Sequence, residues 1–445
     1  MATAGFGFSA NTDPIMAVKE AIDAAGVPGA TFALVSCTVD NDVAAVNDAF
    51  VSELPDAQLQ GVTSCGNILM AGGAVPGVGC LLFDAPGSFV TAYGEDGGAA
   101  AADLKQNGNV LEGTPQAIIM ATTPGNEEAA MEQIGIEYPG TRIYGGTAAD
   151  NALDGSWKVL TGGGAKDGGV ALVAVLDGVK FGASMLDGRE MYTPTDTLAT
   201  VTKVTGETGS LTGGREVLEI DYKPALDTLE GWYGVGTGER RRYLVENPPE
   251  LRRMTAAIPL CTKNQRYRGA DIEYLPVHCS TLDPEGRSAS FFAPLMPGQQ
   301  VWRRRRRRRR RPRLLTPPPL PPLPPLTPRA ALASQIVLMD AGDGPATGYA
   351  ASLSKAYDAA STIELGLGRT DTIENPIAGV LIYCGGMSIA VGDNLDAGLS
   401  DAAFLERVEG LPLLGITAFG EQAPMKAGPT SNKQRNLSVG MLLFE

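Results

Sequence analysis

The chain has 445 residues, of which 44% are hydrophobic and 19% are charged. This length and composition predict a folded protein of two or three domains with sizeable cores. No apolar stretch approaches the ~20 residues that a membrane-spanning helix needs, and the first residues lack the features of a signal peptide, so we expect a cytoplasmic protein. The formal net charge is −14, and it becomes −24 without the ten arginines at 303–311 and 313, which argues against nucleic acid as a partner.

The six cysteines give no sign of a metal site. They form no Cys-x-x-Cys pair, and none has a zinc-like spacing from the single histidine, His278. In a protein without a secretion signal this pattern is typical of reduced, mostly buried thiols. We therefore expect neither a metal nor a cofactor.

The N-terminal part opens with a strand at 5–9 and a helix that starts at Pro14 and is capped by Asp13. Three later segments then share one pattern: an apolar run, a helix-like segment, a proline and a Gly-x-Thr stretch. The apolar runs are 32–37, 117–122 and 379–384, and the Gly-x-Thr stretches begin at Gly61, Gly145 and Gly415. Each segment reads as strand, helix, strand, and strands joined in this way are normally parallel.

Polar residues gather where these strands should end. The carboxyl edge of such a sheet is where ligands usually bind. We therefore expect the following residues to line one or two ligand pockets: Cys37, Thr63, Ser64, Cys65, Asn67, Thr122, Thr147, Asp150, Asn151, Cys384, Thr417 and Glu421. A purely structural interpretation stays open, because small residues after a strand also allow tight turns and close helix packing.

Antiparallel strands are expected beside the repeated segments. The runs 77–83 and 88–93 should form one pair, and 157–160 and 170–176 another. The glycine-rich stretch 162–169 between the latter two has neither the spacing of a phosphate-binding loop nor a following helix, so we interpret it as a hairpin connection. Asn126 is expected to cap the helix that opens with Glu127 and Glu128.

The second half continues the mixture of strands and helices. Strands are expected at 201–204, 217–220, 273–278 and 288–293, with a helix from Pro224 to about Trp232. A further helix carries Leu353 and Tyr357 on one face, and the last strand is expected at 436–444. The prediction is an α/β protein of two domains, 1–225 and 226–445, whose mixed sheets are built from parallel strand-helix-strand units with β meanders.

Residues 302–329 do not fit this pattern. Nine consecutive arginines precede a proline-rich run, and neither can build a core, so we expect a disordered insert within the second domain. It could be a basic tether for nucleic acid or membrane, a proline-rich ligand of another domain, or a segment without function such as a translated intron. Deleting 303–329 should leave the melting temperature unchanged or higher.

The repeated stretches resemble the FIST family. The resemblance rests on Gly61-Val62-Thr63-Ser64-Cys65-Gly66-Asn67-Ile68, on Gly145-Gly146-Thr147-Ala148-Ala149-Asp150-Asn151, on the run from Val217 to Leu226, and on Gly415-Ile416-Thr417-Ala418-Phe419-Gly420-Glu421. It covers nearly the whole chain outside the insert and implies an N-terminal and a C-terminal FIST domain. Family members are sensory modules that bind small ligands, amino acids among the candidates, and report to a signalling partner.

The chain departs from the family pattern at two places. Val62 and Asn67 stand where the family usually has a cysteine and a glutamate, and Arg435-Asn436-Leu437-Ser438 replaces a His-Asn-Gln-Thr pattern. In some eukaryotic relatives an F-box precedes the FIST region. None fits ahead of the FIST-like part here, so we expect any signalling output to come from a partner.

The leading hypothesis is a small-ligand sensor without catalytic activity. The alternatives are an adaptor or ubiquitin-ligase-linked scaffold, an enzyme that uses Cys65, and a haem-based gas sensor with His278 as axial ligand. Cys65 lies in a glycine-bounded turn, where backbone N–H groups could lower the pKa of its thiol. With one histidine in the chain, a Ser-His-Asp or Cys-His arrangement would have to use His278.

Overall fold

The structure is a computed structural model that describes residues 2–69, 73–186, 188–206, 214–234, 238–264, 273–297, 335–340, 345–366, 369–391, 395–425 and 428–445. The arginine- and proline-rich insert predicted at 302–329 lies outside the described residues. In the ranges given, no helix is both long and apolar enough to cross a membrane.

The three predicted strand-helix-strand units are confirmed. The first is β2 (Phe32–Cys37), α2 (Val43–Glu53) and β3 (Gln58–Thr63); the second is β8 (Ala117–Thr122), α4 (Glu127–Glu137) and β9 (Ile143–Thr147); the third is β24 (Ala378–Cys384), α10 (Gly385–Val391), α11 (Leu395–Leu399), α12 (Ala402–Val408) and β25 (Leu413–Ala418). The two strands of each unit pair in parallel. All residues of β2, β8 and β24 are buried, because apolar side chains cover both faces of these strands.

Each unit is the centre of a six-stranded mixed sheet. The first sheet has the order β1 (Thr3–Ser9), β6 (Val78–Asp84), β2, β3, β10 (Val159–Thr161), β11 (Gly164–Lys166); the second β27 (Gly428–Arg435), β26 (Glu421–Met425), β9, β8, β12 (Val170–Val175), β7 (Phe89–Gly94); the third β13 (Phe181–Met185), β28 (Val439–Phe444), β24, β25, β4 (Asn67–Leu69), β5 (Gly73–Val75). The predicted pairs of 77–83 with 88–93 and of 157–160 with 170–176 are wrong. β6 and β7 lie in different sheets, and so do β10 and β12, because the glycine-rich stretch forms β11 and turns back onto β10, while β12 pairs with β7 and β8.

The units exchange hairpins in a cycle. The hairpin β4–β5, which follows the first unit, pairs with β25 of the third. The hairpin β10–β11 follows the second unit and pairs with β3 of the first. The hairpin β26–β27 follows the third unit and pairs with β9 of the second. Each Gly-x-Thr stretch is therefore the point where the chain leaves one sheet for another.

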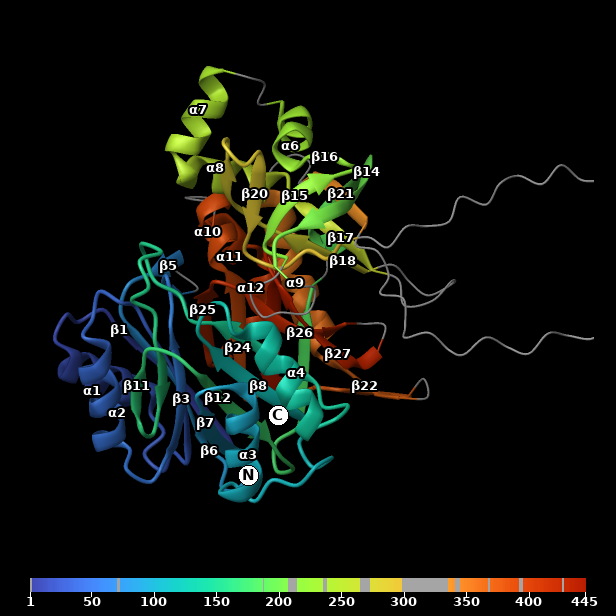
Figure 1. Ribbon diagram of the computed structural model, residues 1–445. Helices are drawn as coiled ribbons and strands as arrows, with labels where there is room; N and C mark the ends of the chain where they lie inside the picture. The colour runs from blue at the N-terminus through green and yellow to red at the C-terminus, as the bar shows by residue number, and fades with distance from the viewer. Residues whose placement is uncertain are drawn as a thin grey trace, which may run out of the picture.

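The inner faces of the three sheets share one apolar core. Residues from all three sheets meet in it, and five phenylalanine rings stack or meet edge to face along its length: Phe32, Phe83, Phe89, Phe181 and Phe444. Helices cover the outer faces. In Figure 1, α1 (Pro14–Ala25) and α2 lie at the left over the first sheet, α3 (Gly97–Gln106) and α4 cover the second, and α9 (Pro345–Ala360) lies with α10–α12 against the third.

A separate sheet lies at the top of Figure 1 and has its own core. Its order is β18 (Glu273–Val277), β17 (Leu260–Asn264), β21 (Gln335–Asp340), β14 (Thr193–Val204), β15 (Glu216–Ile220), β20 (Ser288–Phe291), β19 (Cys279–Asp283), with β16 (Lys223–Pro224) beside β15. The helices of this upper unit are α6 (Ala225–Tyr233), α7 (Glu239–Glu246) and α8 (Pro248–Ala257), while the short α5 (Gly188–Met191) leads into β14 and β22 (Thr362–Gly366) pairs with β23 (Arg369–Thr372). The boundary predicted after residue 225 falls at the first residue of α6 and stays a prediction.

The helix starts show one difference from expectation. The Asp13 carboxylate accepts a hydrogen bond from the Met16 amide at 2.9 Å, so the predicted cap of α1 is confirmed. Asn126 precedes α4, but its side chain makes no capping bond and donates instead to the Thr123 hydroxyl. The predicted Asn126 cap is therefore wrong. The Gly125 amide, which precedes the helix, instead donates a hydrogen bond to the Glu127 carboxylate at 2.8 Å.

Candidate functional site

The three Gly-x-Thr stretches meet at one place, which we call the turn junction (61–67, 145–151 and 415–421). The Ser64 hydroxyl lies 3.1 Å from that of Thr417 and accepts from the Thr417 amide at 2.9 Å. The Ala149 amide donates to the Thr63 carbonyl oxygen at 2.9 Å, and the Thr147 amide donates to that of Gly420 at 2.8 Å. The stretches that were expected to converge therefore touch one another in all three pairings.

Close backbone contact explains the repeated glycine. A Cβ added to Gly145 would lie 1.9 Å from the Met120 carbonyl oxygen, and one on Gly61 would lie 2.4 Å from that of Val35. At Gly415 a Cβ would meet the Ile68 side chain of the exchanged hairpin at 2.5 Å. Only glycine fits where neighbouring strands and the exchanged hairpins approach this closely.

Most predicted site residues serve the junction itself. The hydroxyls of Thr63 and Thr122 bond to backbone groups, and Thr147 accepts from the Gln422 amide at 2.8 Å. The Asp150 carboxylate accepts from the amides of Ala152, Leu153 and Gly155, so it holds the loop after β9. These bonds agree with the structural interpretation of the turns, and the binding role predicted for these residues stays a prediction.

Three further predicted residues lie away from any shared pocket. Cys37 is fully buried in the core between the first sheet and its helices. The Asn67 amide donates to the Gly77 carbonyl oxygen at 2.9 Å. The Asn151 side chain is exposed and donates to Asp40 at 2.9 Å. The structure does not bring these three side chains together.

The environment of Cys65 raises the pKa of its thiol, whereas an activated thiol has a lowered pKa. Its sulfur lies 3.2 Å from the Asp150 carbonyl oxygen, to which it donates. Burial raises the pKa of this thiol to about 12, against the smaller lowering effect of its hydrogen bonds. The hypothesis that the turn lowers the pKa of Cys65 is therefore wrong, because desolvation outweighs the nearby N–H groups.

Cys384 and Glu421 form a buried pair next to the junction. Burial raises the pKa of the Glu421 carboxyl well above its usual range, and the amide of Ser438 and the thiol of Cys384 hydrogen-bond to it. The Leu437 amide donates to the Cys384 sulfur at 3.2 Å. Burial, followed by the charge of Glu421, raises the pKa of this thiol as well. Burial therefore disfavours the charged form of both groups.

A pocket lies beside the junction, and we call it the strand-end pocket. It is lined by Leu153, Arg252, His278, Phe292, Cys384, Gly386, Phe419 and Asn436. Of the predicted ligand-binding residues, Cys384 alone lines it. The pocket lies where β24 and β25 end, which is the edge at which a ligand was expected.

Two polar groups of this pocket have unused capacity. The Asn436 side chain is 1% exposed, and its Oδ1 has no hydrogen-bond partner among the described residues. A buried acceptor in this state is costly unless something fills it. Arg252 is half-buried, and within the described ranges no carboxylate pairs with its guanidinium. Two residues that line the pocket therefore carry an unfilled acceptor and a cation without a counter-charge.

His278 is a neutral wall of the pocket. Its Nε2 lies 2.8 Å from the Arg252 carbonyl oxygen, which can only accept, so the proton of the ring lies on Nε2. Burial, with a smaller effect of the Arg252 charge, lowers the pKa of His278 to about 4. Haem ligation through Nε2 would require this bond to break. In the described part of the chain, no three His, Cys, Asp or Glu side chains gather as metal ligands.

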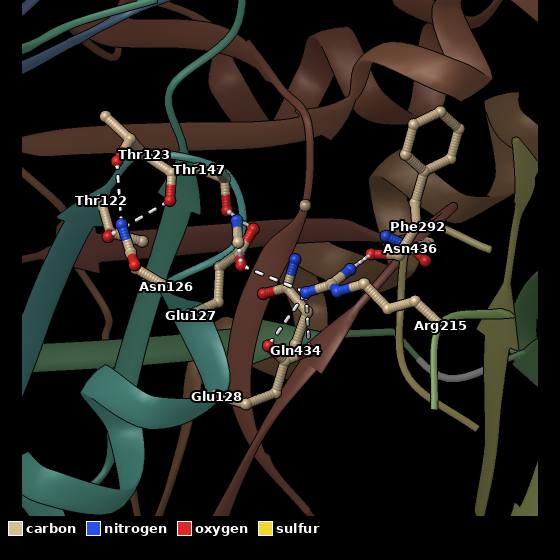
Figure 2. Close-up of polar contacts among 12 residues, drawn as sticks. Thr122, Thr123, Asn126, Glu127, Glu128, Thr147, Arg215, Phe292, Gln434 and Asn436 are labelled. Atoms are coloured by element: carbon tan, nitrogen blue, oxygen red, sulfur yellow. Dashed lines mark hydrogen bonds and ion pairs between the residues drawn. The ribbon is translucent and has the colours of Figure 1, made fainter. Parts of the chain in front are cut away.

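A bridge crosses from the upper unit to the second sheet, and we call it the Arg215 bridge (Arg215, Glu127 and Glu128). In Figure 2, Arg215 reaches toward the start of α4, where its Nη2 lies 3.0 Å from Glu128 Oε2 and 3.4 Å from Glu127 Oε2. Its Nη1 donates to the Phe292 carbonyl oxygen. Burial first and then Glu128 raise the pKa of Glu127 to about 7, while Arg215 opposes the rise.

Sequence reasoning missed most of the pocket lining. Arg252 stands among several arginines of an ordinary amphipathic segment, and Phe292 lies at the end of a short strand, so neither carries a local signal. Asn436 does carry one, since it occupies a position within the second departure from the family pattern. Arg215 follows a stretch without a periodic pattern.

The comparison with protein families places a match in the first half of the chain. Residues 31–223 match the FIST N domain. This match includes the first two strand-helix-strand units and the strand that follows Arg215. No curated protein matches the chain.

Proposed function

From the match of residues 31–223 to the FIST N domain, a domain of a sensory and signal-transduction family, we propose that the chain binds a small ligand in the strand-end pocket. The observation that carries the proposal is the buried Asn436 Oδ1, which has no partner among the described residues and belongs to a pocket at the ends of β24 and β25. A ligand that donates a hydrogen bond would satisfy it.

The other polar groups narrow the ligand class. Arg252 supplies a positive charge that suits a carboxylate. Asn436 supplies an acceptor that suits an ammonium group, and Phe292 and Phe419 supply apolar walls. A small amino acid carries a carboxylate, an ammonium group and a short side chain, so it fits these three features. We propose that such a ligand is sensed in the cytoplasm and reported to a separate protein partner, without catalysis.

A thermal-shift screen of the full chain against amino acids and related small carboxylates tests this proposal. A ligand at 100 times its Kd adds about 2.7 kcal/mol to the free energy of unfolding, which raises the melting temperature measurably. Arg252→Met should remove most of this rise. Arg253→Met is the matched control, because the neighbouring Arg253 is exposed and pairs with Glu250 on the same helix. A screen without any stabilising compound, or a rise that survives Arg252→Met, would contradict the proposal.

A further inference from the structure

The two aromatic walls of the strand-end pocket are tied to the same point. Phe292 is held through its carbonyl oxygen by Arg215, which contacts Glu127 and Glu128. Phe419 is held through its amide, which donates to the Thr147 carbonyl oxygen at 3.1 Å. The Thr147 hydroxyl in turn donates to Glu127 Oε1 at 3.3 Å. Both walls are therefore connected to Glu127, at the start of α4 in the second sheet.

From these contacts we propose that Arg215 and Glu128 are positioning residues for the strand-end pocket, and that the Arg215 bridge transmits its occupancy to the start of α4. The function of the bridge rests on the proposed function of the pocket. The geometry suits this role because one guanidinium holds two partners at once, the pocket wall on one side and the α4 carboxylates on the other.

The hydrogen bonds and ion pairs of the Arg215 bridge are largely shielded from water. The side chain of Glu127 is 4% exposed and those of Arg215 and Glu128 are 23% and 26% exposed, so water competes only weakly for these bonds. The Phe291 amide donates to the Arg215 carbonyl oxygen at 2.8 Å, and the Phe292 amide donates to that of His278 at 2.9 Å. A ligand that moves Phe292 therefore pulls on the arginine as well.

Amide hydrogen exchange on the full chain tests the bridge without any ligand. The Gly125 amide reports on the α4 end, since it donates to Glu127 Oε2, and the Phe292 amide reports on the wall. Arg215→Met should lower the protection of both amides roughly tenfold and leave the strand β2 unchanged. Arg407→Met is the matched control, because Arg407 forms a comparable ion pair with Asp358 that is remote from the pocket.

A conservative variant separates positioning from general support. Arg215→Lys carries one ammonium group, which can reach the α4 carboxylates but cannot also hold the Phe292 carbonyl oxygen. We expect protection of Gly125 to be kept in this variant and that of Phe292 to be lost. Should Arg215→Met fail to fold, Glu128→Gln removes the closest carboxylate with little change of volume and is expected to lower protection at Gly125.

The transmission itself is tested by a double-mutant comparison. Phe292→Ala should lower the protection of Gly125 when Arg215 is present and should have no further effect in Arg215→Met. An equal effect in both backgrounds would overturn the proposal. If the thermal-shift screen finds a ligand, Arg215→Met should weaken its Kd about tenfold. If the screen finds none, the proposed function fails, while the exchange measurements still decide whether the bridge couples the wall to α4.

Discussion

Strand β9 runs so close to β8 at Gly145 that the position has no room for a side chain. We expect Gly145→Ala to lower the free energy of unfolding by about 1–3 kcal/mol, since the added Cβ meets backbone that cannot rotate away. Gly135→Ala in α4 is the control: no atom lies within 4 Å of its added Cβ, and alanine favours a helix by up to ~1 kcal/mol. Urea unfolding of both variants measures the difference, and equal stabilities would contradict the steric argument.

Glu127 should make stability depend on pH in a direction unusual for a carboxyl. Its pKa is about 7 in the folded chain against an ordinary value of 4.5, so the folded state binds the proton more tightly than the unfolded one. The contribution of Glu127 to the free energy of unfolding is therefore fully present below pH 4.5 and is lost as the pH rises through 7. Glu127→Gln should be more stable than the parent at pH 8, by up to ~3 kcal/mol, and about equal to it at pH 4.

His278 has the opposite effect, because its pKa is lowered from 6.5 to about 4. The unfolded state binds its proton more tightly, so stability from this group falls as the pH drops from 6.5 to 4. Glu127→Gln removes the opposing effect of Glu127. The free energy of unfolding of this variant should therefore rise from pH 4 to 6.5, as the pKa of His278 requires. Glu132→Gln, an exposed position of the same helix, should keep the parental profile. Urea unfolding at several pH values distinguishes these outcomes.

At the scale of elements, Ser64 and Thr417 connect a strand of the third sheet to a hairpin that arrives from the first unit. Their hydroxyls are buried and contact each other and the Gly66 carbonyl oxygen. Ser64→Ala and Thr417→Val should each cost about 1–3 kcal/mol of stability, because they leave buried partners unsatisfied. In a double-mutant cycle the two losses should fail to add by at least ~0.5 kcal/mol. Additive losses would show that the contact does not hold the hairpin.

The elements themselves were largely predictable, whereas their partners were not. Buried apolar runs such as 117–122 and the aspartate before α1 have local signatures, and the parallel pairing of each unit followed from the apolar runs. Nothing local indicates that β4 pairs with β25, because the register of an exchanged hairpin depends on contacts far away in the sequence. The strand-end pocket was missed for the same reason, since Arg252 and Asn436 come from different units.

At the scale of the whole molecule, the cyclic exchange predicts that the first half cannot fold alone. In a fragment of residues 1–225, the hairpin β4–β5 would lack β25, and β9 would lack β26. The apolar faces that meet the third sheet in the common core would be exposed to water. We expect a poorly dispersed NMR spectrum for this fragment and recovery of structure on co-expression with 226–445. A cooperative unfolding transition of the fragment by itself would refute this.

The same exchange sets an order of events during synthesis. The contact between Ser64 and Thr417 cannot form until Thr417 has been synthesised, 353 residues further along the chain. At a ribosome speed of about 5–20 residues per second, the hairpin β4–β5 stays without its partner strand for roughly 20–70 s. Unpaired strand edges are templates for association between nascent chains, and such distant contacts also slow refolding. We therefore expect chaperones to bind the newly made N-terminal half until the last strands leave the ribosome.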